Sequence, residues 1–148
     1  MRYFDENILA LIELLEYDMY IVQPDPKIDC VCRNYETRQG DPMCPRCLGT
    51  GRKIKIRKIK GVRQPDDNTN KGDKVTTEEC WYFFRNQYQV HAGDLIVWNN
   101  RIEKIVKVER YCSDSNMPVY YHCDAVRKKT DTRPFLVNFY RAIRGSKK

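Results

Sequence analysis

The sequence has little of what a membrane or secreted protein needs. No apolar run in its 148 residues approaches the roughly 20 residues of a membrane-spanning helix. The first residues, MRYFDENILALIELLEYDM, carry acidic side chains where a secretory signal peptide carries basic ones, and they lack a small-residue cleavage site. We therefore expect a chain made in the cytoplasm, with no membrane partner.

Catalytic groups are also scarce. The chain has 2 histidines, His91 and His122, and neither stands beside a second catalytic group in a known motif. The stretch GTGRK has neither the spacing of a phosphate-binding loop nor the dinucleotide-binding fingerprint. The paired acids Asp66-Asp67 and Glu78-Glu79 fit a polar loop and a strand edge, where solvation explains them. We expect no enzyme activity and no small-molecule substrate.

Charge is abundant but unevenly placed. The net charge is +7, yet residues 1–29 hold 2 basic and 7 acidic side chains, a net of −5. Residues 30–148 hold 25 basic and 13 acidic side chains, a net of +12, and residues 46–63 contain eight basic residues and no acid. This asymmetry indicates an acidic partner, such as nucleic acid or a negative protein surface. A solvated basic face beside an acidic helix explains it equally well.

Apolar spacing predicts one N-terminal helix, over residues 7–20. Asp5, Glu6 or Asn7 could cap its start, and the prolines of QPDP at residues 23–26 would end it. The stripe that predicts this helix consists of Ile8, Leu11, Ile12, Leu15 and Met19.

The remainder alternates as strands. Ile54 and Ile56 share one face of a strand, but Ile59 breaks the alternation and predicts a bulge or strand bend near Arg57. Two β-branched and aromatic runs flank Asn99-Asn100 and predict a hairpin, because asparagine tolerates the positive φ of a tight turn. The last segment, residues 133–145, fits a helix or a strand, and its flanking proline and glycine slightly favour a helix.

Short strands joined by turns after a single helix predict a mainly β fold. We expect a small antiparallel β-barrel or sandwich with an N-terminal α-helix and a zinc-ribbon-like cysteine insert. Residues 1–26 would form the helix and a linker, residues 27–52 the cysteine-rich insert, and residues 53–148 the β domain. These three segments together are expected to form one compact unit.

Four of the 7 cysteines form two close pairs within the insert, Cys30 with Cys32 and Cys44 with Cys47. An odd cysteine count fits a reducing compartment, where metal binding is more common than disulfides. Two turns, each pointing two sulfurs at one ion, predict a closed tetrahedral zinc site made by Cys30, Cys32, Cys44 and Cys47. The alternatives are four reduced cysteines without metal, or disulfides.

Two features qualify this site. The first pair has a one-residue gap, which puts one of its members in doubt as a ligand and makes Asp29 and Asp41 substitute candidates. Gly49 and Gly51 would let the backbone curl so that amide N–H groups approach the sulfurs.

The other cysteines have no such spacing. Cys80 and Cys123 lie in predicted strands and are expected to be small core residues. A second metal site around them, with His122 as an extra ligand, is a weak alternative. His91 precedes a turn and is expected to hydrogen-bond locally.

CPRCLGTG, residues 44–51, matches the CxxCxGxG unit of the cysteine-rich region of J-domain chaperones, but only one copy is present and the His-Pro-Asp motif is missing. A longer stretch resembles neck or head–tail connector proteins of tailed bacteriophages. The resemblance comprises a cysteine pair, the CxxCxGTG unit and a segment similar to head-closure proteins, HAGDLIVWNNRIEKIVKVE. The chain departs from that pattern at Cys30 and Cys32, where CxxC would be expected.

The resemblance implies a structural virion protein, made in the host cytoplasm, that forms a ring joining capsid to tail. Its partners would be copies of itself, other neck, portal or tail proteins, and DNA in the channel. The alternative is a zinc-ribbon protein that binds nucleic acid through the basic run 52–60. Isoleucines rather than stacking aromatics alternate with those basic residues, which counts against that alternative.

Overall fold

The fold is mainly β, in agreement with the predicted class. The structure is a computed structural model and describes residues 2–3, 5–65, 79–113, 117–128 and 132–145. Its elements are β1 (Arg2–Tyr3), α1 (Glu6–Leu15), β2 (Tyr17–Asp29), β3 (Arg52–Pro65), β4 (Glu79–Arg85), β5 (Leu95–Trp98), β6 (Arg101–Cys112), β7 (Pro118–Arg127) and α2 (Thr132–Gly145).

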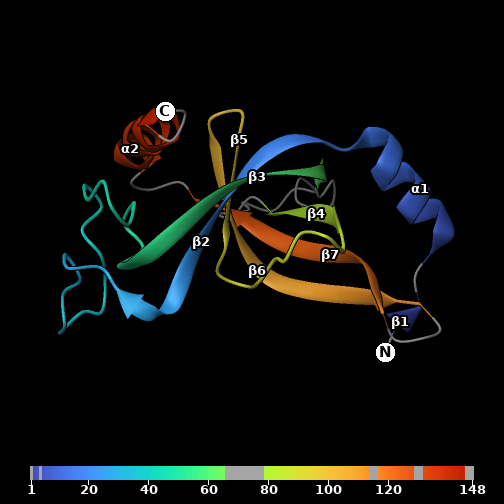
Figure 1. The fold of residues 1–148 in the computed structure, drawn as a ribbon, viewed down its shortest axis with the longest axis horizontal. Helices are drawn as coiled ribbons and strands as arrows, with labels where there is room; N and C mark the ends of the chain where they lie inside the picture. The colour runs from blue at the N-terminus through green and yellow to red at the C-terminus, as the bar shows by residue number, and fades with distance from the viewer. Residues whose placement is uncertain (1, 4, 66–78, 114–116, 129–131, 146–148) are drawn as a thin grey trace, which may run out of the picture.

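Six antiparallel strands form a sheet that closes on itself. Their order is β6-β5-β2-β3-β4-β7, and β7 pairs again with β6 to complete the ring. The short β1 adds to β6 in parallel. Figure 1 shows α1 at one end of the long axis and α2, with the loop between β2 and β3, at the other end. Closure leaves few unpaired strand edges.

Two apolar clusters lie on opposite faces of this sheet. The inner cluster fills the ring with side chains from all six strands, among them Ile21, Tyr82, Phe84, Ile96 and Ile105. The outer cluster lies beneath α2 and includes Val22, Leu95, Val97, Phe135 and Phe139. Neighbouring residues of one strand therefore enter different clusters, because successive side chains of a strand point to opposite faces.

This arrangement explains the parity break in β3 and corrects one prediction. Ile54 and Ile56 pack on the outer cluster, whereas Ile59 belongs to the inner one. Pairing with β2 runs without a shift from Gly61 to Ile54, so the bulge predicted near Arg57 is wrong. The alternation of isoleucines breaks because β3 buries side chains on both of its faces, not because it contains an extra residue.

The predicted N-terminal helix is too long. Its start is as expected, because the Asp5 side chain accepts a hydrogen bond from the Asn7 amide at 2.8 Å. The helix ends at Leu15, however, and β2 runs from Tyr17 through the QPDP stretch. Glu16 ends the helix in extended backbone and accepts two hydrogen bonds from the Arg85 guanidinium, at 2.7 and 3.0 Å.

Two other local predictions are confirmed, the tight hairpin turn and the C-terminal helix. Asn99 and Asn100 form the hairpin turn with φ of 50° and 60°. The ambiguous C-terminal segment is α2, and its residues at helical spacing, Phe135, Phe139 and Ile143, pack on the outer cluster. Within the described residues, neither helix is long and apolar enough to cross a membrane. The three-segment division of the chain stays a prediction, although β2 crosses the boundary expected at residue 26.

Candidate metal centre

The cysteine insert is the long connection between two paired strands. Asp29 at the end of β2 pairs with Arg52 at the start of β3, and the Cys30 amide donates to the Gly51 carbonyl at 2.9 Å. The sheet therefore fixes both ends of the insert. Cys30 is held at the first of these ends and the glycines that follow Cys47 at the second.

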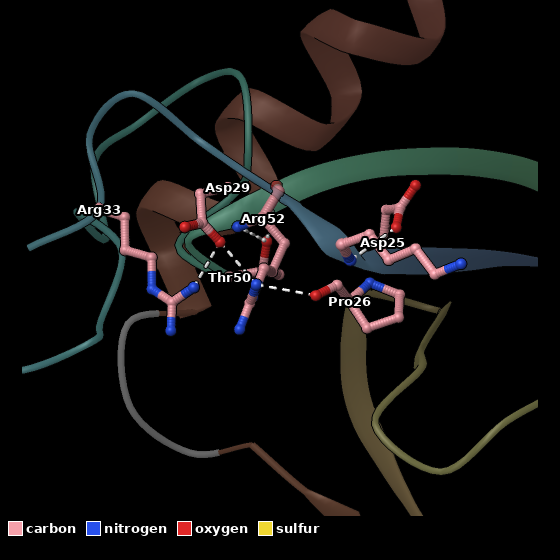
Figure 2. Close-up of polar contacts among 7 residues, drawn as sticks. Asp25, Pro26, Asp29, Arg33, Thr50 and Arg52 are labelled. Atoms are coloured by element: carbon pink, nitrogen blue, oxygen red, sulfur yellow. Dashed lines mark hydrogen bonds and ion pairs between the residues drawn. The ribbon is translucent and has the colours of Figure 1, made fainter. Parts of the chain in front are cut away.

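A cluster of charged side chains closes the base of the insert (Figure 2). Asp29 Oδ1 lies 2.5 Å from Arg33 Nη1 and 2.5 Å from Arg52 Nη1. The same Arg52 nitrogen donates to the Pro26 carbonyl at 2.9 Å. Asp29 is thus engaged with two arginines and does not join the cysteines, so its candidacy as a substitute ligand was wrong.

Four sulfur atoms converge inside the insert. The Sγ atoms of Cys30 and Cys44 lie 3.7 Å apart, and those of Cys32 and Cys47 lie 3.4 Å apart. All four lie within 4.8 Å of one another, and all four cysteines are free thiols rather than disulfides. Sulfurs bound tetrahedrally at about 2.3 Å from one ion would be separated by about 3.8 Å. The four predicted residues are therefore brought together in an arrangement that could hold one metal ion.

Local turns orient the second cysteine pair, Cys44 and Cys47. The Cys44 amide donates to the Asp41 carbonyl at 2.9 Å, and the Leu48 amide donates to the Cys44 carbonyl at 3.1 Å. This single helical turn puts Cys44 and Cys47 on one side, because residues three apart face the same way. Asp41 Oδ1 accepts from the Met43 amide at 2.9 Å, so this carboxylate serves the turn instead of a metal.

Backbone N–H groups point at the sulfurs, as the glycine positions predicted. The Gly49 and Gly51 amides donate to the Cys47 sulfur, and both glycines have positive φ, of 85° and 74°. The helical turn that begins at Cys44 contributes in the same way, because the amides of Arg46 and Cys47 donate to the Cys44 sulfur. Such donors stabilise negative charge on sulfur and support a thiolate-bound ion.

The pKa values of the thiols reflect these contacts. Burial disfavours the thiolate of Cys44, but the amides of Cys47 and Arg46 outweigh it and lower the pKa to about 7. Burial and the hydrogen bonds that its own thiol donates to the neighbouring cysteine sulfurs raise the pKa of Cys32 to about 12. Metal binding must therefore release protons from this cluster, which makes the affinity pH-dependent.

Contacts that sequence reasoning missed attach the insert to the sheet. Leu48 is only 1% exposed and belongs to the outer cluster, and Asn138 Nδ2 of α2 donates to the Met43 carbonyl at 3.2 Å. A Cβ at Gly40 would lie 2.3 Å from the Gly51 amide nitrogen, so the two chain segments approach as closely as backbone allows. In the sequence, the one sign of these contacts was Leu48, an apolar residue in a polar stretch.

Cys80 and Cys123 occupy the core positions predicted for them. Both are buried in the inner cluster, and no second group of metal-ligating side chains gathers in the described parts of the chain. The His91 amide donates to Asp94 Oδ2 at 2.8 Å, the local hydrogen bond expected at that turn.

Sequence reasoning also missed a buried carboxylate. Glu103 is 1% exposed inside the ring, where Arg63 donates to both carboxylate oxygens at 2.6 and 2.9 Å. The Cys80 thiol donates at 2.9 Å and the Tyr82 hydroxyl donates as well. Burial raises the pKa of Glu103, but these hydrogen bonds outweigh burial and hold the pKa below its ordinary value. Every partner is itself a protein group, so the network is a structural part of the core.

No protein-family model matches the chain, and no curated protein matches it in sequence. Family membership therefore supplies no function for the cysteine cluster or for the sheet. What the molecule does has to be inferred from the chemistry and placement of its own residues.

Proposed function

We propose that Cys30, Cys32, Cys44 and Cys47 bind one zinc ion with a structural role. Four sulfur ligands complete a tetrahedral shell and leave no position for water or substrate, which is typical of structural zinc. The separations of 3.4 and 3.7 Å between paired sulfurs support this assignment. When bound, the ion would supply cross-links between two turns that otherwise share few apolar contacts.

We further propose that the chain is a structural virion protein of a tailed phage. It would be a ring subunit in the neck that joins the capsid and portal to the tail. The observation that carries this proposal is the four-cysteine insert ending in CxxCxGTG, set into a small closed β sheet. This combination is what the resemblance to head–tail connector proteins leads us to expect.

The proposal requires no active site. The one metal-ligating cluster in the described residues is closed, and the buried Glu103 network is satisfied by protein groups. A connector subunit needs a stable core, projections and surfaces complementary to its neighbours. The closed sheet supplies the core, and α1 and the insert project from it.

A zinc-stabilised nucleic-acid-binding protein is the second candidate. The observation in its favour is the exposed lysines of β3, Lys53, Lys55, Lys58 and Lys60. Strand alternation divides these lysines between two faces of the sheet, so they do not form one stripe along a phosphate backbone. DNA inside a connector channel would account for a modest affinity of the same residues.

Metal analysis and native mass spectrometry of the purified chain test the zinc assignment. We expect one zinc ion per chain, displaced by acid or a strong chelator. Less than half an equivalent, in protein purified without chelators and supplied with zinc, would refute the site.

Proteomic analysis of purified virions from a phage encoding this chain tests the connector role. We expect several copies per particle, and we expect a phage lacking the gene to yield filled heads and separate tails. Absence of the chain from intact particles would refute the proposal. Tight binding to random duplex DNA at physiological salt would favour the second candidate instead.

A further inference from the structure

We propose that copies of this chain join head to tail, with α1 of one copy seated in an apolar, basic-rimmed groove beside α2 of the next. This inference rests on the ring-forming function proposed above and names the two surfaces that would form the ring. The surfaces are called here the leucine ridge (Leu11, Leu14 and Leu15) and the α2 groove (Tyr20, Ile54, Ile56, Ala142 and Ile143).

The leucine ridge is an apolar surface that the described residues leave largely exposed. Leu11, Leu14 and Leu15 are 49%, 78% and 54% exposed, and Ile12 is the one buried residue of α1. The three leucines occupy one side of the helix, because positions three and four apart are neighbours on its surface. Three adjacent, largely exposed leucines on one helix mark an interaction surface rather than ordinary solvent-facing positions.

Acidic residues surround this ridge. Between residues 5 and 16 the chain has four acidic side chains and no basic one, and Glu6 and Glu13 are exposed on α1. Glu16 is bound to Arg85 and so fixes the end of the helix against the sheet. The ridge is therefore presented in a defined orientation with negative charge along its border.

The α2 groove has the complementary character. It is a hollow of about 490 Å³ between α2, the outer face of β3 and the cysteine insert. Apolar side chains line it, and the insert contributes Pro45 and Arg46. Arg46 and Lys58 stand in its wall, where Lys58 forms an ion pair with Asp18 at 3.5 Å, and Lys60 is exposed farther along the same face of β3. An acidic, leucine-bearing helix matches such a groove in both polarity and charge.

The two surfaces cannot meet within one molecule. α1 and α2 lie at opposite ends of the long axis (Figure 1). A contact between unlike surfaces of identical chains is heterologous, and repetition of it produces a ring when the rotation closes. A second copy of this chain is therefore the occupant that the charge distribution favours.

The metal centre contributes to the same groove. Pro45 and Arg46 stand between Cys44 and Cys47, so sulfur coordination positions one wall of the hollow. Removal of zinc should weaken self-association even where the closed sheet remains folded.

The sharpest test uses two variants, one that disrupts the leucine ridge and one that disrupts the α2 groove. Leu14→Glu adds charge to the ridge, and Ala142→Glu places charge and bulk in the groove; neither residue belongs to a buried cluster. Val137→Glu, at another exposed apolar position of α2, is the matched control. Sedimentation velocity and native mass spectrometry of the zinc-loaded full chain should show concentration-dependent assembly for the parent and the control. Each test variant should assemble at least about tenfold more weakly.

Mixing the two variants gives a specific outcome. In the mixture, Leu14→Glu supplies an intact groove and Ala142→Glu supplies an intact ridge. The two variants should therefore form one-to-one dimers and no larger species. Assembly of the parent should also weaken as salt rises, because the charged borders are screened.

The following results would overturn the inference. These are a parent chain that stays monomeric up to about 1 mM, variants that assemble as well as the parent, and mixtures that form no dimer. Loss of assembly by Leu14→Glu alone would instead indicate that ridges pair with one another, and this too contradicts the proposal. A monomeric chain found in virions would refute this interface and leave the connector role standing. Head-to-tail assembly by a chain that is missing from virions would refute the connector role and leave this interface standing.

Discussion

The closed sheet and the cysteine insert reach an ordered structure by different means. The sheet buries large side chains on both faces, with Tyr82 and Phe84 inside the ring and Phe135 and Phe139 outside it. Over residues 30–51, the buried side chains are those of Cys44, Cys47 and Leu48. A segment with so little apolar burial cannot offset the entropy of ordering its backbone. Metal–sulfur bonds are the means by which such a segment can be held, while the sheet does without them.

Removal of the metal should produce the largest effect, and the effect should be confined to the insert. Zinc binding in small metal-dependent folds contributes on the order of 10 kcal/mol at neutral pH. We expect chelation, or Cys47→Ser, to unfold residues 30–51 while the strands stay paired. Hydrogen exchange read by mass spectrometry should show loss of protection in the insert alone.

Cys112→Ser provides the control, because Cys112 lies outside the sulfur cluster. It should leave both zinc content and exchange unchanged. Protection of the insert amides that survives complete removal of zinc would show that the contrast between the two regions is mistaken.

The opposite experiment breaks the sheet and spares the insert. Glu103→Gln keeps the shape of the buried side chain but leaves Arg63 without its counter-charge. Breaking a buried ion pair by changing one partner costs about 3–5 kcal/mol. Urea unfolding at neutral pH should show this loss of stability, with zinc still bound in the folded state. Glu79→Gln, at an exposed position of β4, should have no comparable effect.

Acid should act through the same carboxylate. The folded pKa of Glu103 lies below its ordinary value of 4.5, so its stabilising contribution is present above that value. The contribution is lost as the pH falls through the folded pKa. Unfolding free energies measured between pH 7 and pH 3 should therefore decline more steeply for the parent than for Glu103→Gln. Equal slopes would mean that Glu103 does not titrate as the hydrogen bonds require.

A smaller change inside the insert tests how closely its two ends must approach. Gly40→Ala would bring a Cβ within 2.3 Å of the Gly51 nitrogen, and neither backbone can move far. Overpacking of this kind costs about 1–3 kcal/mol, and zinc affinity should fall by about tenfold or more. Competition with a chelator measures the zinc affinity, and the neighbouring change Gln39→Ala is the control. Unchanged affinity would show that the insert adapts more freely than its backbone contacts suggest.

Local sequence patterns predicted the parts of the molecule that local chemistry determines. The Asn99-Asn100 turn, the helical spacing of Phe135 and Phe139 and the paired cysteines all depend on near neighbours in the chain. Met19 misled because it fits a helical stripe and also alternates with Tyr20 along a strand. Met19 lies in a strand because β2 pairs with β3 and β5 and because Glu16 contacts Arg85 where the helix ends. Those contacts join residues far apart in sequence.

The unpredicted parts of the site have the same origin. Glu103 stands between Ile102 and Lys104 and is charged, as a solvent-facing residue would be, and its burial follows only from Arg63 and Tyr82 on other strands. Gly40 stands in a polar stretch, and its need to be glycine comes from the Gly51 backbone eleven positions later. Cysteine spacing indicates ligands, but the packing that aims them at one point depends on the whole fold.

The smallest expected effect concerns the tight turn between β5 and β6. Asn99 has φ of 50°, a conformation that costs an ordinary residue about 1–2 kcal/mol. Asn99→Ala should therefore lower the unfolding free energy by about 1 kcal/mol, whereas Asn99→Gly should not lower it. Since Asn99 is exposed and belongs to the sheet, zinc affinity should be the same in both variants. A change in zinc affinity would show that the sheet and the insert are coupled more tightly than their separate means of stabilisation imply.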